Sequence, residues 1–533
     1  MVMLLAMVAV SAAGGAAQEP PPFVIELADD ATLPMTGQWG ASGNLSVIAR
    51  VNFMRQEPVP DGRFFVNDLN GPLYVLDRAT KAPTLYLNLN GRDGAPGLFE
   101  RLGFPTGLGQ GFVSFQFDPD YRHNGRFYTV HVEELAAGGS PQPRGTSVPG
   151  LDLTGYTTTA PVPVVGEALR EGVVVEWTDT DITNSTFEGT ARELLRMQLN
   201  LQLHPTGDMI FDPTAKPGDA DWRVMYLTVG DGGAGEQKDE RRSAPQRLDM
   251  MVGKVLRIIP DLALRSSSST ISANGRYRIP DDNPFVEIPG ALKEIWALGL
   301  RNPHRLIWDV DPLNPRDNRL IVMSIGLRSW ESVYIVRKGA NFGYSEREGN
   351  QFLDPETNLA APLAGDDTLP IRIGPTGTRG TMAPTYPVLQ YTRPGGFAIA
   401  GGVVYRGMSL PELRGKFLFG DLLTGRLWLA DLADMIAADD GRPETVAPFR
   451  EVRVRWRRPA GADGGVTELI ETMRPMTAAA YEARRDADPA GKGARAPGRV
   501  DIRFAVDAAG EIYITTKADG MIRKVVVAEQ PMR

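Results

Sequence analysis

The four histidines are the first candidates for acid–base chemistry, because the chain contains no cysteine. They are His123, His131, His204 and His304. An imidazole exchanges protons near neutral pH, but four rings are too few for a rich imidazole metal cluster. Without cysteine the chain has no disulfide, thiolate metal site, iron–sulfur cluster or covalently attached c-type haem. Any redox chemistry must therefore use another cofactor.

His204 ends the most regular polar and apolar alternation in the sequence. Between residues 195 and 204 apolar side chains alternate with Arg, Gln, Asn and His. A period of two predicts a strand with one apolar and one polar face. The turn at Pro205–Gly207 would then let His204 project into a ligand cavity. The alternative is a half-buried histidine that is hydrogen-bonded to a carbonyl.

Asp231 and Asp239 are the candidate metal ligands. Gly230–Gly233 ends a predicted strand that begins at Val224, and several side chains with oxygen ligands follow before residue 250. Oxygen ligands are what a hard cation such as calcium prefers. A tight turn followed by a charged surface loop explains the same residues equally well.

The elements that must position these residues are short strands. Six similar β-rich runs or pairs of runs recur, within 62–77, 125–130, 224–258, 319–336, 415–430 and 510–525. Glycine and proline make up 58 and 42 of 533 residues, which favours turns over long helices. The pattern predicts an all-β fold, a single six-bladed β-propeller over 23–530. A large β-sandwich or two smaller β domains is the alternative.

Long insertions should separate some of these strands, at about 138–165, 262–280, 350–390 and 455–500. Within the last, residues 477–485 have a briefly helical pattern. Residues 1–17 are apolar and end in Gly-Ala-Ala, which predicts a signal peptide and a periplasmic or secreted protein, although no basic residue precedes Arg50. No later stretch is long and apolar enough to span a bilayer. A net charge of −8 without a basic block makes nucleic acid an improbable partner.

In chain order, the local motifs resemble those of the soluble sugar dehydrogenases that use pyrroloquinoline quinone, the glucose/sorbosone dehydrogenase family. The resemblance runs from about Phe64 to the end of the chain. Its markers are residues 115–119 (FQFDP), 124–128 (NGRFY), His204 with Gly207 and Phe211, 230–233 (GDGG), 253–257 (GKVLR), 279–285 (IPDDNPF), 294–303 (EIWALGLRNP), 341–344 (NFGY), 401–407 (GGVVYRG), 410–413 (LPEL) and 415–421 (GKFLFGD).

The resemblance implies that His204 is the general base in the oxidation of an aldose. It would take the proton of the anomeric hydroxyl while hydride passes from that carbon to the quinone. A calcium ion would polarise the accepting carbonyl, and an external acceptor, a quinone or a cytochrome, would take the electrons. The quinone bears three carboxylates, and the candidates to bind it are Lys254, Arg301, Arg393, Arg406 and Gln246.

Three positions depart from the family pattern. Leu203 stands where relatives commonly have Asp or Asn, Ala234–Gly235 where active relatives often have an Arg-Asn pair, and Arg393 where the family often has His. Two other functions therefore stay open. One is a non-catalytic propeller that binds a glycan or a protein at its rim. The other is a calcium-dependent lactonase or esterase with His204 as base and Asp231 as metal ligand.

Overall fold

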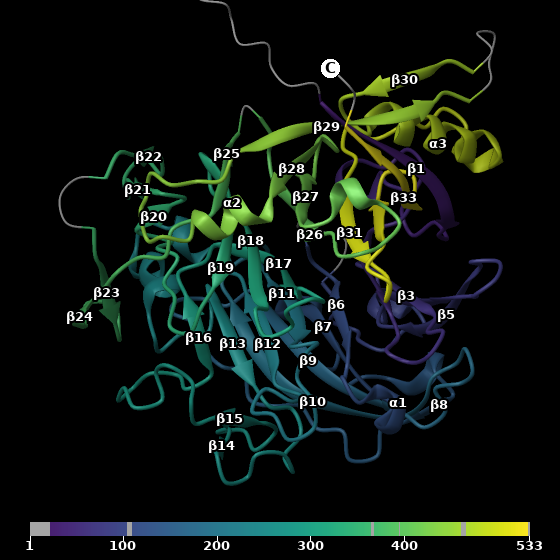
Figure 1. Cartoon of the computed structure of the whole chain (residues 1–533). Helices are drawn as coiled ribbons and strands as arrows, with labels where there is room; N and C mark the ends of the chain where they lie inside the picture. The colour runs from purple at the N-terminus through teal and green to yellow at the C-terminus, as the bar shows by residue number, and fades with distance from the viewer. Residues whose placement is uncertain (1–21, 104–108, 364–366, 394, 460–464, 531–533) are drawn as a thin grey trace, which may run out of the picture.

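The computed structural model describes residues 22–103, 109–363, 367–393, 395–459 and 465–530, and strands dominate it (Figure 1). The all-β prediction is confirmed. The described residues hold three short α-helices, α1 (Tyr121–Asn124), α2 (Leu432–Ala437) and α3 (Arg474–Asp486). None of these helices is long and apolar enough to cross a membrane. The predicted signal peptide, residues 1–17, lies outside the described residues.

Four separate sheets each contain a run of four antiparallel strands. The first is β2 (Val51–Gln56), β3 (Phe64–Asp68), β4 (Pro72–Leu76) and β5 (Pro83–Asn88). The second is β6 (Phe112–Phe117), β7 (Arg126–Glu134), β9 (Arg170–Asp179) and β10 (Glu188–Leu199), with β8 (Gly150–Asp152) at its edge. The third is β11 (Thr206–Phe211), β12 (Met225–Val229), β13 (Lys254–Ile258) and β16 (Ile295–Leu298). The fourth is β17 (Asn302–Asp309), β18 (Arg319–Ile325), β19 (Trp330–Val336) and β25 (Leu389–Thr392).

A nine-stranded sheet contains two further runs of four. One is β26 (Ile399–Val404), β27 (Lys416–Asp421), β28 (Leu427–Asp431) and β29 (Phe449–Arg457), to which β30 (Thr467–Ile470) adds. The other is β31 (Ile502–Val506), β32 (Ile512–Thr516), β33 (Met521–Glu529) and β1 (Phe23–Thr32). The strand β1 pairs antiparallel with β33 and parallel with β29, so it joins the two runs. In Figure 1 the purple β1 lies beside the yellow β33.

The first strands of the six runs contact one another in sequence. The strand β2 contacts β6, β6 contacts β11, β11 contacts β17, β17 contacts β26, β26 contacts β31, and β31 contacts β2 again. Apolar layers fill the space between neighbouring runs: Phe65 of the first run, for example, packs in one cluster with Phe115 and Trp177 of the second. Because both faces of these sheets are covered, most side chains of their strands are buried on both faces.

The strand predicted over 195–204 ends earlier, at Leu199. The Asn200 side chain donates to the carbonyls of Val165 and Glu167 and so stops the strand. The expected polar face is not open to a ligand either. Arg196 is buried and forms ion pairs with Glu133 and Glu171, both at 2.8 Å. The alternation therefore reflects burial of a charged network on the second face.

The predicted insertions carry small elements of their own. Residues 262–280 contain the hairpin β14 (Ser269–Ile271) and β15 (Arg278–Pro280). The region around 350–390 holds β20 (Arg347–Glu348), β21 (Gln351–Leu353), β22 (Ala360–Ala361) and the hairpin β23 (Leu369–Arg372) and β24 (Thr378–Met382). The helical prediction for 477–485 is confirmed by α3, which starts with Pro475 in its first turn and ends with Arg484 and Arg485.

Candidate functional site

A cavity of about 440 Å³ lies where the first strands of the six runs begin. His204 and Arg301, which precede β11 and β17, line it, as does Arg393, which precedes β26. Arg50, which precedes β2, and Arg503 of β31 line it too. In the ring of first strands, β11 and β17 lie across from β31 and β2. The cavity is therefore enclosed by side chains that come from opposite sides of the ring.

His204 is held in a strained conformation at the edge of this cavity. It is almost fully buried and has a φ of 45°, in the left-handed region that side chains other than glycine rarely adopt. Its Nδ1 lies 2.6 Å from Oδ1 of Asp231. Because an ionised carboxylate only accepts hydrogen bonds, this contact assigns the proton to Nδ1 and leaves Nε2 with a free lone pair.

Asp231 is fully buried, and the chain holds its carboxylate in place. Oδ1 also accepts a hydrogen bond from the Gly233 amide, and Oδ2 accepts one from the Gly235 amide, both at 2.9 Å. Burial alone would raise the pKa of Asp231, but the neighbouring His204, Arg301 and the Gly233 amide lower it. The carboxylate is thus ionised and oriented toward the imidazole.

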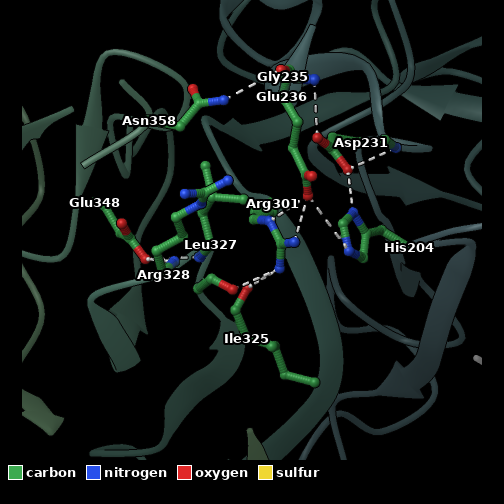
Figure 2. Close-up of polar contacts among 12 residues, drawn as sticks. His204, Asp231, Gly235, Glu236, Arg301, Ile325, Leu327, Arg328, Glu348 and Asn358 are labelled. Carbon is green, nitrogen blue, oxygen red and sulfur yellow. Dashed lines mark hydrogen bonds and ion pairs between the residues drawn. The ribbon is translucent and has the colours of Figure 1, made fainter. Parts of the chain in front are cut away.

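Glu236 and Arg301 complete the neighbourhood of the imidazole (Figure 2). Oε1 of Glu236 lies 3.9 Å from Nε2 of His204 and accepts a hydrogen bond from Nε of Arg301 at 3.0 Å. The Arg301 guanidinium also donates to the Gly326 carbonyl at 2.5 Å. Each of these charged groups therefore has a partner of opposite charge or a carbonyl.

Arg393 faces the cavity from the neighbouring run. It donates to the Gly326 carbonyl at 3.1 Å, and it lies 3.6 Å from Oε1 of Glu331. Glu331 is fully buried, and burial raises its pKa to about 8, against the opposing effects of the Ile399 amide and of Arg393. At neutral pH this carboxyl group therefore carries a proton for much of the time.

The structure does not bring the other predicted cofactor residues to the cavity. The Lys254 ammonium is buried and donates to the carbonyls of Ala244, Pro245 and Val252. Gln246 bonds to Asn341 and to the Tyr344 carbonyl. Arg406 forms an ion pair with Asp309 at 2.7 Å. Each is satisfied by the protein around it, which gives it a structural role.

The two predicted metal ligands are also engaged by protein groups. Both oxygens of Asp231 accept the hydrogen bonds described above, and both oxygens of the exposed Asp239 accept from Arg241. Within the described ranges, no group of three or more His, Asp or Glu side chains is placed to hold a metal ion. The side chains around Asp231 and Asp239 therefore do not fit a calcium ion.

The departure at Ala234–Gly235 has a steric reason. A Cβ atom on Gly235 would lie 2.4 Å from a ring carbon of Tyr344 and 3.0 Å from Oδ2 of Asp231. Ala234 and Gly235 instead belong to the 3₁₀ turn Ala234–Glu236, and the Gly235 amide donates to the Asp231 carboxylate. An asparagine at position 235, the second residue of the Arg-Asn pair, does not fit this arrangement.

Sequence reasoning missed several residues that line the cavity, among them Arg50, Arg305, Arg503 and Lys517, and it missed Glu236, which lies beside the imidazole. The four that line the cavity are charged residues in or next to a strand, whereas Glu236 lies in the 3₁₀ turn Ala234–Glu236. The one shared signal is their position, since Arg50, Arg503 and Arg305 lie at or near the start of a first strand, where the ring of strands converges.

A family model described as Glucose / Sorbosone dehydrogenase matches residues 54–464. The HIPL1 protein of Arabidopsis thaliana is 24% identical over 399 residues, which are 72% of this chain and 53% of that protein. The aldose sugar dehydrogenase YliI of Escherichia coli (strain K12) is 32% identical over 141 residues, 26% of this chain and 29% of that protein. The chain thus spans about half or less of the curated relatives it matches.

Among solved structures, the soluble aldose sugar dehydrogenase of Escherichia coli in its apo form superposes with a TM-score of 0.50. The superposition covers 91% of this chain and 97% of that one, at 16% sequence identity. At this identity the likeness concerns the fold alone.

Proposed function

Because the chain belongs to the glucose/sorbosone dehydrogenase family, we propose that it oxidises the anomeric carbon of an aldose, with pyrroloquinoline quinone as the hydride acceptor. The observation that carries this proposal is the His204–Asp231 pair at the edge of a cavity lined by cations. An oriented imidazole is a suitable general base, and the cations suit an anionic cofactor.

We further propose that the fold is a six-bladed propeller. The six runs of four strands, whose first strands contact in a closed sequence, are six blades of one propeller over residues 23–530. The strand β1 completes the last blade, and closing the ring protects the inner sheet edges. With residues 1–17 as a signal peptide, the protein would act in the periplasm or outside the cell, and an external quinone or cytochrome would take its electrons.

The chain's own residues would move the proton. Nε2 of His204 accepts the proton of the anomeric hydroxyl, and the bond from Nδ1 to Asp231 keeps the ring in the right tautomer. The imidazolium then lies between Asp231 and Glu236, which stabilise its positive charge. Bound quinone supplies the two-electron acceptor for the hydride, so that the sugar leaves as a lactone.

Arg301 and Arg393 are the chain's candidates to hold the quinone carboxylates, because both line the cavity. Lys254, Gln246 and Arg406 are not part of this proposal. Calcium remains expected from the family resemblance alone, and no step here is assigned to it.

The experiment is reduction of an artificial dye by protein loaded with pyrroloquinoline quinone and calcium, over a panel of aldoses. We expect His204→Ala to lower turnover by about 10²–10⁴-fold, while quinone titration of the variant gives a similar affinity. The matched control is His123→Ala, because His123 is exposed and pairs only with Asp120. A variant that turns over sugar at the parental rate would show that His204 is not the base.

A second candidate is a non-catalytic propeller that binds a glycan or a protein at its rim. The close packing at Gly235 favours it, since Tyr344 leaves no room for the Asn that active relatives often have at this position. In the same experiment, binding of quinone without turnover of any aldose would support this candidate, and so would the absence of any quinone binding. A lactone or ester hydrolysed in the presence of calcium would support the third possibility, a lactonase.

A further inference from the structure

Four buried cations lining the cavity take no part in the proposed proton transfer. They are Arg50, Arg305, Arg503 and Lys517, and each is more than nine-tenths buried. None of them forms an ion pair with a carboxylate among the residues that the structure describes. We call these four residues the cation wall.

The cation wall is held mainly by neutral acceptors. Arg50 donates to Oδ1 of Asn70 at 2.9 Å. Arg305 reaches from β17 to the Asn52 carbonyl at 2.7 Å, and Arg503 donates to Oδ1 of Asn52 at 3.1 Å. For the Lys517 ammonium, the described part of the chain shows no hydrogen-bond acceptor. The Lys517 side chain is buried at the cavity surface, and its ammonium has no partner among the described residues.

The carboxylates near the cation wall have other partners: Thr36 donates to Asp68, and Arg55 pairs with Asp208. Asp501 is the one carboxylate among the described residues that line the cavity, and it is already paired with Arg499 at 2.7 Å. Burial and repulsion from Arg503 hold the pKa of Lys517 well below its usual value. Burial likewise lowers the pKa of Arg50 and of Arg503 to about 10. Asp68 lies near Arg50, Asp208 near Arg305, and Asp501 near Arg503 and Lys517, but in the described part of the chain none of these carboxylates forms an ion pair with a wall residue. Burying four cations without paired carboxylates costs free energy, so the wall is suited to an anion from outside the chain.

The cation wall is also separate from the imidazole. Lys517 and Arg503 belong to the last run of strands and Arg50 precedes the first run, across the ring from His204. Arg305 lies four residues along the chain from Arg301. Since a strand rises about 3.3 Å per residue, their backbones are about 13 Å apart or less. A ligand that touches both His204 and the wall must therefore span much of the cavity, as a sugar with a charged substituent could.

We propose that the cation wall binds the carboxylate of an acidic sugar, so that the aldose oxidised by this protein is a uronic acid. This rests on the proposed function. Guanidinium groups suit a carboxylate because they can donate two parallel hydrogen bonds. The reaction is otherwise unchanged: the anomeric C–H bond breaks with its electron pair passing to the quinone, the hydroxyl proton goes to His204, and an acidic lactone leaves.

The first test needs no quinone and no turnover. Purified protein is melted with D-glucuronate or with D-glucose, which lacks the carboxylate. We expect D-glucuronate to raise Tm and D-glucose to leave it nearly unchanged, since a ligand that binds only the folded state stabilises it. The shift should be lost in Lys517→Met and in Arg503→Gln, and should persist in Lys338→Met, where the lysine is exposed. An equal shift with both sugars, or one that both wall variants keep, would overturn the proposal.

Inorganic phosphate is the control for charge alone. If phosphate raises Tm as much as D-glucuronate at the same concentration and ionic strength, the wall binds anions without regard to the sugar, and the uronic acid is the wrong ligand. Titration with pyrroloquinoline quinone is the second control. If Lys517→Met and Arg503→Gln lose quinone affinity while the D-glucuronate shift remains, the wall holds the cofactor instead.

The second test uses the protein loaded with quinone and calcium. We expect the ratio of kcat/KM for D-glucuronate over D-glucose to fall at least tenfold in Lys517→Met, mainly through the KM for D-glucuronate. Lys338→Met should keep the parental ratio. If neither sugar is oxidised by any of these proteins, the proposed function fails, whereas the melting experiment still decides whether the wall binds a uronate.

Discussion

The two sides of the cavity carry similar charged residues but treat them differently. On the side of His204, each charge meets its partner: Asp231 binds the imidazole, and Glu236 and the Gly326 carbonyl bind Arg301. On the side of the cation wall, Arg503 and Lys517 meet only neutral groups or none. The arrangement of the first side suits the proposed proton transfer, and that of the second side suits the proposed binding of an external anion.

This contrast shows how the free energy of a charged group depends on its partners. A buried charge with fixed partners stabilises one protonation state and one geometry. A buried charge without a partner destabilises the ligand-free protein, and binding of a ligand of opposite charge removes this cost. Substitutions on the two sides should therefore have opposite effects on stability.

The largest expected effect is that of Asp231→Asn on turnover. The amide nitrogen would have to face the Gly233 or Gly235 amide, so that two donors meet, and the imidazole would lose its charged partner. We expect kcat for the aldose to fall about 10²–10⁴-fold. Steady-state kinetics with the quinone-loaded variant measure this, and a parental kcat would show that the pair does not act in catalysis.

Arg301→Met should destabilise the paired side. It removes both hydrogen bonds to Glu236 and the donor to the Gly326 carbonyl. We expect the free energy of unfolding to fall by about 2–3 kcal/mol. Urea denaturation with an unchanged m-value measures it, and a variant as stable as the parent would break the contrast between the two sides.

Glu331→Gln tests the pH dependence of the paired side. The pKa of Glu331 is raised by burial to about 8 in the folded protein, above its ordinary value in the unfolded chain. A raised pKa gives stability that is fully present below about pH 4.5 and is lost as pH rises through 8. We expect Glu331→Gln to be more stable than the parent at pH 9, and this difference to shrink as pH falls toward 4.5, where the parent carboxyl group is neutral in both states. Similar pH–stability curves for both proteins would contradict this.

The smallest effect is that of Lys517→Met, and its sign is opposite to that of Arg301→Met. It replaces an unpartnered buried ammonium with an apolar side chain of similar length. Without ligand, we expect the free energy of unfolding to rise by about 1 kcal/mol. Denaturation in a buffer without multivalent anions measures it. A loss of stability would mean that Lys517 has a structural partner.

The sequence predicted the strands well because their signals are local. The runs at 319–323 and 333–336, for example, lie within β18 and β19. The strand β1 was missed, because its partners β29 and β33 lie more than 400 residues away along the chain. The polar and apolar pattern of a segment does not reveal which distant strand will pair with it.

The site was predicted less completely, and two lysines show why. Lys254 was expected to bind the cofactor, yet its ammonium meets three carbonyl oxygens. Lys517 was not singled out, yet it lines the cavity without such partners. Lys254 is the first residue of β13, and Lys517 directly follows β32. What separates them is the set of backbone carbonyls that the fold places nearby, and local sequence does not specify it.

The pairing of β1 with β33 bears on how the molecule is made. Residues 23–32 and 521–529 lie at opposite ends of the described chain, so they cannot meet until nearly the whole polypeptide has been synthesised. Contacts of such long sequence separation form slowly, because the entropy of closing the loop must be overcome first. Until then the edge of β1 that pairs with β33 is exposed and prone to join strands of other chains. Closure of the ring is thus a late step in folding, and unfolding of the amino-terminal segment would be an early step in the loss of structure.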